Sequence, residues 1–189
     1  MISAILLAAG QSKRMVGENK LAKEIKGIPL IKLSVKNILA SSIDELIVVL
    51  GHQKEIIEKL IDKNEKIKFV FNKDFESGMA SSIKTGIDNL SDKTEAFFIC
   101  LGDMPMVNKD IFNLLIKSKN NREIIVPTYK NKQGNPILFS KSMKKKIMTI
   151  EGDAGAKKVL ELNKDKTLNI ETNDQSITKN FNTLDNFSS

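Results

Sequence analysis

Residues 2–15 read ISAILLAAGQSKRM, an apolar run that opens directly into a small, polar loop. The run Ile2 to Leu7 is too short for a typical helix and suits a strand that is buried on both faces. Small residues let the backbone of the loop approach a ligand closely, and these are Ala8, Ala9 and Gly10. Ser12 adds a hydroxyl group, and Arg14 with the nearby Lys20 adds the positive charge that a polyphosphate requires. The segment predicts a strand followed by a phosphate-binding loop.

Further apolar runs of similar length recur along the chain. They occupy Leu46 to Leu50, Ile67 to Phe71, Ala96 to Leu101 and Ile124 to Val126. Helical patterns lie between them, over Pro29 to Leu39, Glu55 to Ile61, Met79 to Leu90 and Ile111 to Ile116. This alternation predicts an α/β fold, a Rossmann-like three-layer sandwich with a mostly parallel sheet. In the less regular carboxyl third we expect a short strand at Ile137 to Phe139 and helices over Ser142 to Met148 and Ala154 to Leu162.

The bulk composition limits the classes of protein to consider. A chain of 189 residues with 41% hydrophobic content can bury one sizeable core, so we expect residues 1–189 to form a single domain. The net charge of +7 suits an anionic ligand, but the lysines are scattered and aromatic residues make up only 5%, so no nucleic-acid partner is expected. Cys100 has no second cysteine to pair with. With no export pattern and no membrane-spanning run, the sequence predicts a cytoplasmic protein without membrane contact.

Asp103 stands in a Gly-Asp-Met-Pro motif at positions 102–105, directly after the apolar run Ala96 to Leu101. Ligands of open parallel sheets bind where the carboxyl ends of the strands meet, so Asp103 should lie beside the loop that begins at Ala8. Asn72 follows another strand-like run and should rim the same crevice. The carboxylate of Asp103 suits a Mg²⁺ ion that bridges to a nucleotide, or it could cap a following helix.

Several motifs resemble those of the molybdopterin nucleotidyltransferases, the family that includes the molybdenum cofactor cytidylyltransferases. The family patterns LAAGxSxRMG, NK, GDMP, GxPxLF and GDxGA have counterparts, in the right order, at Leu7 to Met15, Asn19-Lys20, Gly102 to Pro105, Gly134 to Phe139 and Gly152 to Ala156. These motifs are spread over nearly the whole chain. The resemblance implies a nucleotide-diphospho-sugar transferase-like fold and transfer of a nucleotide from a nucleoside triphosphate.

The resemblance also implies roles for individual residues. Arg14 and Lys20 would contact the phosphates, and Asp103 would hold Mg²⁺ as the third catalytic residue. The implied nucleotide-binding residues are Leu7, Ala8, Ala9, Gly10, Ser12, Arg14, Lys20, Asn72, Gly78, Ser82 and Asp103. The implied acceptor-binding residues are Asn135, Pro136, Gly152, Asp153 and Gly155. From the residues alone, Ser82 could also cap a helix, and the segments around Asn135 and Gly152 could be simple turns.

Two positions depart from the family pattern. Relatives commonly carry a second metal-binding carboxylate where this chain has Asn182, whose amide oxygen could hold Mg²⁺ without adding negative charge. Relatives often carry histidine where this chain has Asn135. These differences keep open a non-catalytic carrier that binds the cofactor and delivers it to a partner enzyme.

The implied reaction transfers CMP from CTP to the terminal phosphate of molybdopterin, or of the molybdenum cofactor, and releases pyrophosphate. CTP is preferred to GTP because guanylyl-transferring relatives usually read Leu-Ala-Gly-Gly where this chain reads Leu7 to Gly10. The alternatives are a GTP-dependent guanylyltransferase and a nucleotidyltransferase acting on sugar or polyol phosphates. A molybdoenzyme would receive the product. The attacking phosphate is already anionic, so no strong general base is required.

Overall fold

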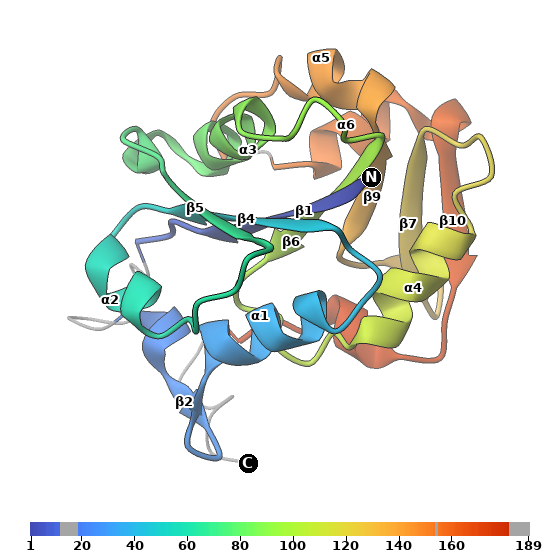
Figure 1. The fold of residues 1–189 in the computed structure, drawn as a ribbon. Helices are drawn as coiled ribbons and strands as arrows, with labels where there is room; N and C mark the ends of the chain where they lie inside the picture. The colour runs from blue at the N-terminus through green and yellow to red at the C-terminus, as the bar shows by residue number, and fades with distance from the viewer. Residues whose placement is uncertain (12–18, 154, 182–189) are drawn as a thin grey trace.

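A mixed β-sheet forms the middle layer of the computed structural model, which describes residues 1–11, 19–153 and 155–181 (Figure 1). Its strands run in the order β10-β7-β9-β6-β1-β4-β5, and β8 pairs with β7. Their bounds are β1 Ile2–Ala8, β4 Glu45–Leu50, β5 Ile67–Phe71, β6 Ala96–Leu101, β7 Ile124–Tyr129, β8 Lys132–Gln133, β9 Ile137–Ser140 and β10 Thr167–Glu171. A separate hairpin joins β2 Glu24–Ile25 to β3 Ile28–Pro29.

The pairing in the sheet is mostly parallel, as predicted. Strand β1 lies parallel to both β4 and β6, so that Leu7 stands opposite Val49 and Leu101. Strand β9 is antiparallel to β6 and to β7, whereas β10 is parallel to β7. The carboxyl ends of β1, β4, β5 and β6 therefore meet at one edge, where the loops that follow them converge.

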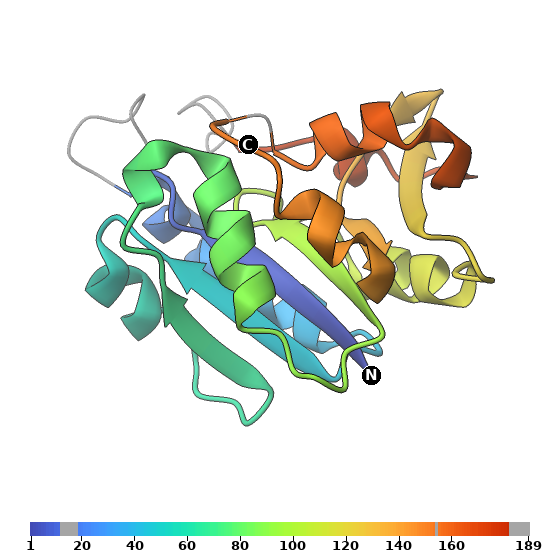
Figure 2. The same ribbon diagram turned by 90° about the horizontal axis from the view of Figure 1, so that it is seen from above.

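Helices cover both faces of the sheet, which confirms the three-layer sandwich (Figures 1 and 2). One face carries α1 Leu30–Leu39, α2 Lys54–Lys59 and α4 Lys109–Lys117, and the other carries α3 Met79–Asp88, α5 Lys144–Ile147 and α6 Lys157–Leu162. Short 3₁₀ helices occupy η1 Lys20–Ala22, η2 Phe75–Ser77, η3 Lys141–Met143, η4 Lys164–Lys166 and η5 Gln175–Thr178. Within the described ranges, no helix has the length and apolar character needed to cross a membrane.

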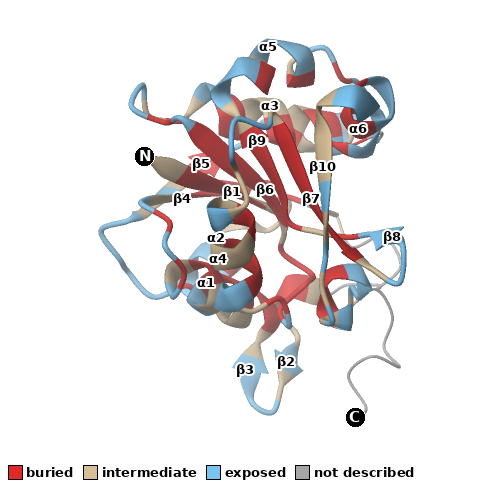
Figure 3. Cartoon of the chain, turned by 90° about the vertical axis from the view of Figure 1, so that its right-hand side faces the viewer, coloured by how far each residue is buried: buried red, intermediate tan, exposed pale blue. Residues whose placement is uncertain are grey.

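The central strands are buried on both faces, which explains their almost entirely apolar sequences (Figure 3). Neighbouring residues of β6 point into opposite halves of the core: Phe98 packs edge-on against Phe112 of α4, and Phe97 stacks on Phe139 of β9. Cys100 lies in the first of these halves, and burial raises the pKa of its thiol far above the usual range. Cys100 is therefore a core residue rather than a reactive nucleophile.

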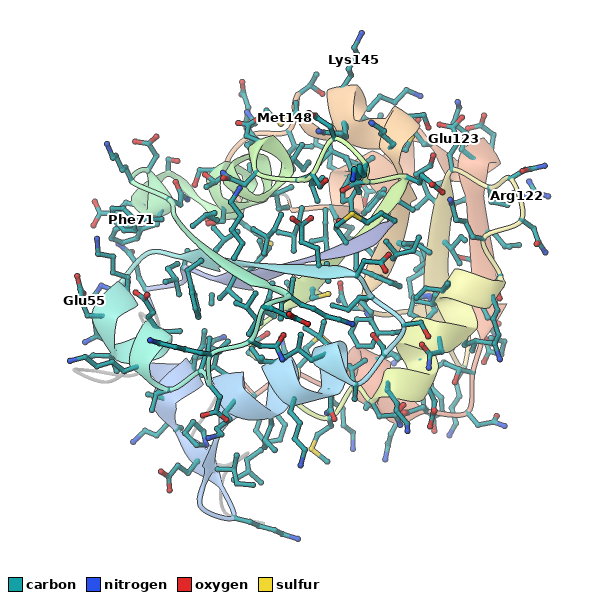
Figure 4. The ribbon with its side chains drawn as sticks, in the orientation of Figure 1. Glu55, Phe71, Arg122, Glu123, Lys145 and Met148 are labelled. Carbon is teal, nitrogen blue, oxygen red and sulfur yellow. The ribbon has the colours of Figure 1, made fainter. Side chains whose placement is uncertain are left out.

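The edges of the sheet lie on opposite sides of the molecule. Phe71 ends β5 on one side, while Glu123 precedes β7 beside the β10 edge on the other (Figure 4). Glu123 forms an ion pair of 2.5 Å with Lys166, the residue just before β10. The hydrogen bond from Lys166 lowers the pKa of the Glu123 carboxyl. This ion pair therefore links the start of the edge strand β10 to the start of the neighbouring strand β7.

Several helix starts differ from the sequence-based expectation by one to three residues, and the backbone explains two of them. Pro29 caps α1 from an extended conformation and pairs with Glu24 in the hairpin, instead of lying in the first turn. Helix α6 begins at Lys157, after the expected start at position 154. Gly152 and Gly155 have φ angles of +61° and +56°, which a right-handed helix excludes, so the chain turns there before the helix begins.

Candidate functional site

A cleft of about 460 Å³ opens where the loops after β1 and β6 come together. Gly10 lines it from the first loop and Asp103 from the second, and the segment from η2 into α3 forms another wall. The sequence-based expectation that these two loops converge at the carboxyl edge of the sheet is therefore met. A cavity of about 410 Å³ between α1 and the hairpin is lined mainly by apolar and lysine side chains and lies apart from these strand ends.

Lys20 and Asp103 form an ion pair inside the cleft. The ammonium nitrogen of Lys20 lies 2.6 Å from an oxygen of Asp103, although the residues are 83 positions apart in sequence. Lys20 begins η1, which is capped by Asn19, whose side chain accepts a hydrogen bond from the backbone N–H of Leu21. The side chains of Lys20 and Asp103 are 23% and 12% exposed, so both charges are partly desolvated yet reachable from the cleft.

In its described part, the end of β1 and the loop after it offer the cleft backbone groups and small side chains rather than charged side chains. Ala8 and Ala9 are buried, Leu7 and Ala9 line the cleft, and Gly10 is exposed with open space where a Cβ would lie. A Cβ on Gly51, after β4, would come within 2.7 Å of the Ala9 side chain, so the two loops are in close contact. Ser12 and Arg14, predicted to bind phosphate, lie outside the described residues.

The amino terminus of α3 forms the wall opposite Asp103. Gly78, with φ +106°, leads into the helix, and Ser82 lines the cleft from its first turns. Asn72 is only 2% exposed and lies behind this wall, where its amide donates hydrogen bonds to the hydroxyls of Ser81 and Ser82 at 2.8 and 3.0 Å. Asn72 therefore supports the wall rather than facing the cleft, and Ser82 is not the capping residue of α3.

The predicted acceptor residues fall into two groups. Gly152 and Asp153 contact α3: the Gly152 carbonyl accepts from the N–H of Ala80 at 2.9 Å, and the Asp153 carboxylate accepts from that of Met79 at 3.1 Å. Gly155 lies near the same methionine, with its Cβ position 3.0 Å from the sulfur, and Asp153 lines the cleft. Asn135 and Pro136 instead border a small gap against α1 and β6, where the Asn135 N–H donates to the carbonyl of Ile177.

Other residues of the cleft were not singled out from the sequence. Gln11 and Glu76 join the two sides of the cleft by a hydrogen bond of 2.9 Å. Asn180 lines the cleft, and the backbone N–H of Phe181 donates to the carbonyl of Asp103 at 2.9 Å. No local pattern marks these residues, since each is defined by a contact between distant segments. Asn182, the predicted second metal ligand, lies outside the described residues.

The described residues supply few metal ligands. Within residues 1–11, 19–153 and 155–181, no group of three or more histidine, cysteine, aspartate or glutamate side chains could hold a metal ion. Among these described residues, the carboxylates that line the cleft belong to Asp103, Asp153 and Glu76, so a cation held by Asp103 would take further ligands from oxygens brought by a bound molecule. Mg²⁺ is commonly bound in this way, by one or two carboxylates together with substrate phosphates and water.

Comparison with known proteins identifies a matching family and several relatives. Residues 4–169 match the family model described as the MobA-like NTP transferase domain. A probable molybdenum cofactor guanylyltransferase of Methanosarcina acetivorans is 29% identical over 153 residues, which cover 79% of this chain and 67% of that protein. The molybdenum cofactor cytidylyltransferase of Escherichia coli is 30% identical over 140 residues, which cover 74% of this chain and 70% of the relative.

A solved structure shares the fold. The nucleotidyl transferase from Methanothermobacter thermautotroptrophicus superposes with a TM-score of 0.85 at 19% identity, over 99% of this chain and 94% of the other. The family resemblance inferred from the motifs is confirmed by the family model and by these relatives. The chain therefore belongs to the nucleotidyltransferases, in the family of MobA-like NTP transferase domains.

Proposed function

We propose that this protein transfers CMP from CTP to the terminal phosphate of a molybdopterin-type acceptor and releases pyrophosphate. The observation that carries the proposal is the Lys20–Asp103 ion pair, which lies in a cleft walled by the loop after β1 and the amino terminus of α3. A cation and a carboxylate beside an open, small-residue loop are the groups that a triphosphate with a bound metal ion requires. Membership of the family supports the same reaction class.

The ion pair gives a simple account of nucleotide binding. A triphosphate entering the cleft offers Lys20 oxygens that carry more charge than the Asp103 carboxylate does. Lys20 would then turn to the phosphates, and Asp103 would be free to bind a divalent cation. The two charges thus compensate each other without nucleotide and take separate partners with it. Neither charge is left unpaired in the partly desolvated cleft in either state.

Mg²⁺ fits this cleft as an ion that arrives with the nucleotide. Asp103 offers a carboxylate reachable from the cleft, and phosphate oxygens would complete the ligand set. When bound, Mg²⁺ neutralises phosphate charge and orients the phosphates for in-line displacement. Lys20 would stabilise the charge that builds on the leaving pyrophosphate, while Ser82 and Gly78 would contact the nucleoside. The anionic acceptor phosphate would attack without a general base.

The choice of CTP depends on the loop sequence Leu7 to Gly10, in which alanine stands at position 9. A GTP-dependent transfer is the second candidate, because the relative from Methanosarcina acetivorans is named as a guanylyltransferase. Sugar or polyol phosphates are further candidate acceptors. A carrier that binds the cofactor without transfer is the candidate of another class, which the asparagine at position 182 keeps open. A molybdoenzyme is the proposed recipient of the product.

A competition assay separates these functions. Pyrophosphate release is measured with CTP, GTP and ATP at fixed Mg²⁺, with molybdopterin or with sugar phosphates as acceptor. We expect the fastest release with CTP and molybdopterin. Faster release with GTP would reassign the nucleotide, and release only with a sugar phosphate would reassign the acceptor. Binding of molybdopterin with no release under any condition would favour the carrier.

Restoring a carboxylate at position 182 should strengthen metal binding. We expect Asn182→Asp to lower the Mg²⁺ concentration at half-maximal rate by about 10-fold, because an added negative charge at the site favours the cation. The measurement is the Mg²⁺ dependence of pyrophosphate release. Asn131→Asp, in the exposed turn after β7, makes the same chemical change away from the cleft and should leave that dependence unaltered. An unchanged Mg²⁺ dependence in Asn182→Asp would argue against position 182 as a metal-binding position.

A further inference from the structure

The loop after β6, residues 102–105, is held by hydrogen bonds from outside the cleft. The hydroxyl of Ser34 donates to the carbonyl of Gly102 at 3.0 Å, and the side-chain amide of Asn37 donates to the carbonyl of Pro105 at 2.8 Å. These carbonyls flank Asp103 on both sides along the chain. Neither Ser34 nor Asn37 lines the cleft itself.

Both donors come from the same side of α1. Ser34 and Asn37 are three residues apart, a spacing that places two side chains side by side on a helix. Ser34 is only 4% exposed and lies among the apolar residues by which α1 packs on the sheet. A buried hydroxyl in such a place is costly unless it has a partner, and here the partner is the loop that carries Asp103.

The same loop is held from two more directions. The N–H of Phe181 donates to the carbonyl of Asp103 at 2.9 Å, and the N–H of Gly102 donates to the carbonyl of Leu7 at 3.1 Å. The carbonyl oxygens of residues 102, 103 and 105 therefore each have a donor outside the β1 loop and α3 walls. An unpaired carbonyl oxygen that faced the cleft would repel a triphosphate. Because these carbonyls accept hydrogen bonds from residues outside the cleft walls, the carboxylate of Asp103 is the oxygen ligand that the loop presents.

We propose that Ser34 and Asn37 are positioning residues: by holding the carbonyls of Gly102 and Pro105, they fix the Asp103 carboxylate for a divalent cation bound with the nucleotide. The identity of the ligand rests on the proposed function, whereas the means by which Asp103 is held does not. Partners that orient metal ligands typically change metal affinity or activity by about 10–100-fold when they are removed.

The test measures metal binding as well as turnover. Mn²⁺ binding in the presence of a non-reactive CTP analogue is followed by electron paramagnetic resonance, and the Mg²⁺ dependence of pyrophosphate release is measured alongside. We expect Ser34→Ala and Asn37→Ala each to weaken Mn²⁺ binding and to raise the half-maximal Mg²⁺ concentration by about 10-fold. The KM for CTP at saturating Mg²⁺ should stay near the wild-type value. Ser34→Thr keeps the hydroxyl and should restore metal binding.

Ser41→Ala is the matched control. The Ser41 hydroxyl is also buried, just past the end of α1, but it donates to the carbonyl of Ile38 at 2.6 Å and does not touch the loop. The Ser41→Ala substitution should lower the melting temperature about as much as Ser34→Ala does and should leave Mn²⁺ binding unchanged. Unaltered Mn²⁺ binding in Ser34→Ala and Asn37→Ala, or equal weakening in Ser41→Ala, would overturn the proposal.

The outcome also separates this inference from the proposed function. If the wild-type protein releases no pyrophosphate but the Mn²⁺ affinities follow the expected order, the function fails and the positioning role stands. If pyrophosphate is released but the Mn²⁺ affinities of all variants equal that of the wild type, the function stands and the positioning role fails. Absence of Mn²⁺ binding by the wild-type protein would also overturn the positioning role.

Discussion

Asp103→Asn is expected to reduce the rate of pyrophosphate release by about 10²–10³-fold while the protein stays folded. Asparagine keeps the shape of the side chain but removes the negative charge that would hold the cation, and loss of one such electrostatic contact typically has this effect. Lys20 would lose its carboxylate partner in a partly desolvated cleft, so the free energy of unfolding should fall by about 1–3 kcal/mol. Steady-state kinetics and thermal unfolding measure the two effects.

The control for this change lies a short distance along the chain. Asp110, in the first turn of α4, is exposed and does not line the cleft. Asp110→Asn removes the same charge and should leave the rate within about two-fold of the wild type, because surface charges outside a site contribute little. If Asp103→Asn also keeps a rate within about two-fold of the wild type, the role given to the Lys20–Asp103 pair is wrong.

Gly78→Ala is expected to cause a large loss of both stability and nucleotide affinity. Gly78 has φ +106° and ψ 176°, a conformation available almost only to glycine, and forcing another residue into it costs about 1–3 kcal/mol. A Cβ there would also lie 2.6 Å from the carbonyl carbon of Gly152 and 2.8 Å from the Asp153 carboxylate. The backbone would have to move, and the start of α3 would separate from residues 152–153. Denaturant unfolding and nucleotide titration measure the losses.

A substitution at a second glycine distinguishes the cost of backbone strain from the cost of a steric clash. Gly27, in the hairpin, also has a positive φ of +77°, but no atom lies within 4 Å of its Cβ position. Gly27→Ala should therefore cost only the strain and leave nucleotide affinity unchanged. Equal destabilisation by Gly27→Ala and Gly78→Ala would mean that the contact with Gly152 places little constraint on the wall of the cleft.

The central strands could be predicted because they are buried on both faces. The run Ala96 to Leu101 is apolar without interruption, and Ile2 to Leu7 is interrupted only by Ser3, so the pattern is visible in sequence alone. Strand β10 is partly exposed at an edge, so its residues alternate and give no such run. The β2–β3 hairpin has strands of only two residues each, too short for any period to be recognised.

The site could be predicted only where it follows from strand order. Lys20 and Asp103 belong to motifs that follow β1 and β6, neighbours whose carboxyl ends must meet. Two other features join segments that are distant in sequence. They are the hydrogen bond from Ser34 to the loop that carries Asp103 and the hydrogen bond from the start of α3 to Asp153. Such contacts are set by the packing of whole layers, and no local spacing of residues encodes them.

The cleft is completed by both ends of the described chain. Gly10 lies near the beginning and Asn180 near the end, and Phe181 is hydrogen-bonded to the Asp103 loop. During synthesis, residues 180 and 181 are among the last of the described residues to leave the ribosome. Until they do, the cleft lacks the Asn180 side of its lining and the Asp103 loop lacks its hydrogen bond from Phe181, so the complete site forms late.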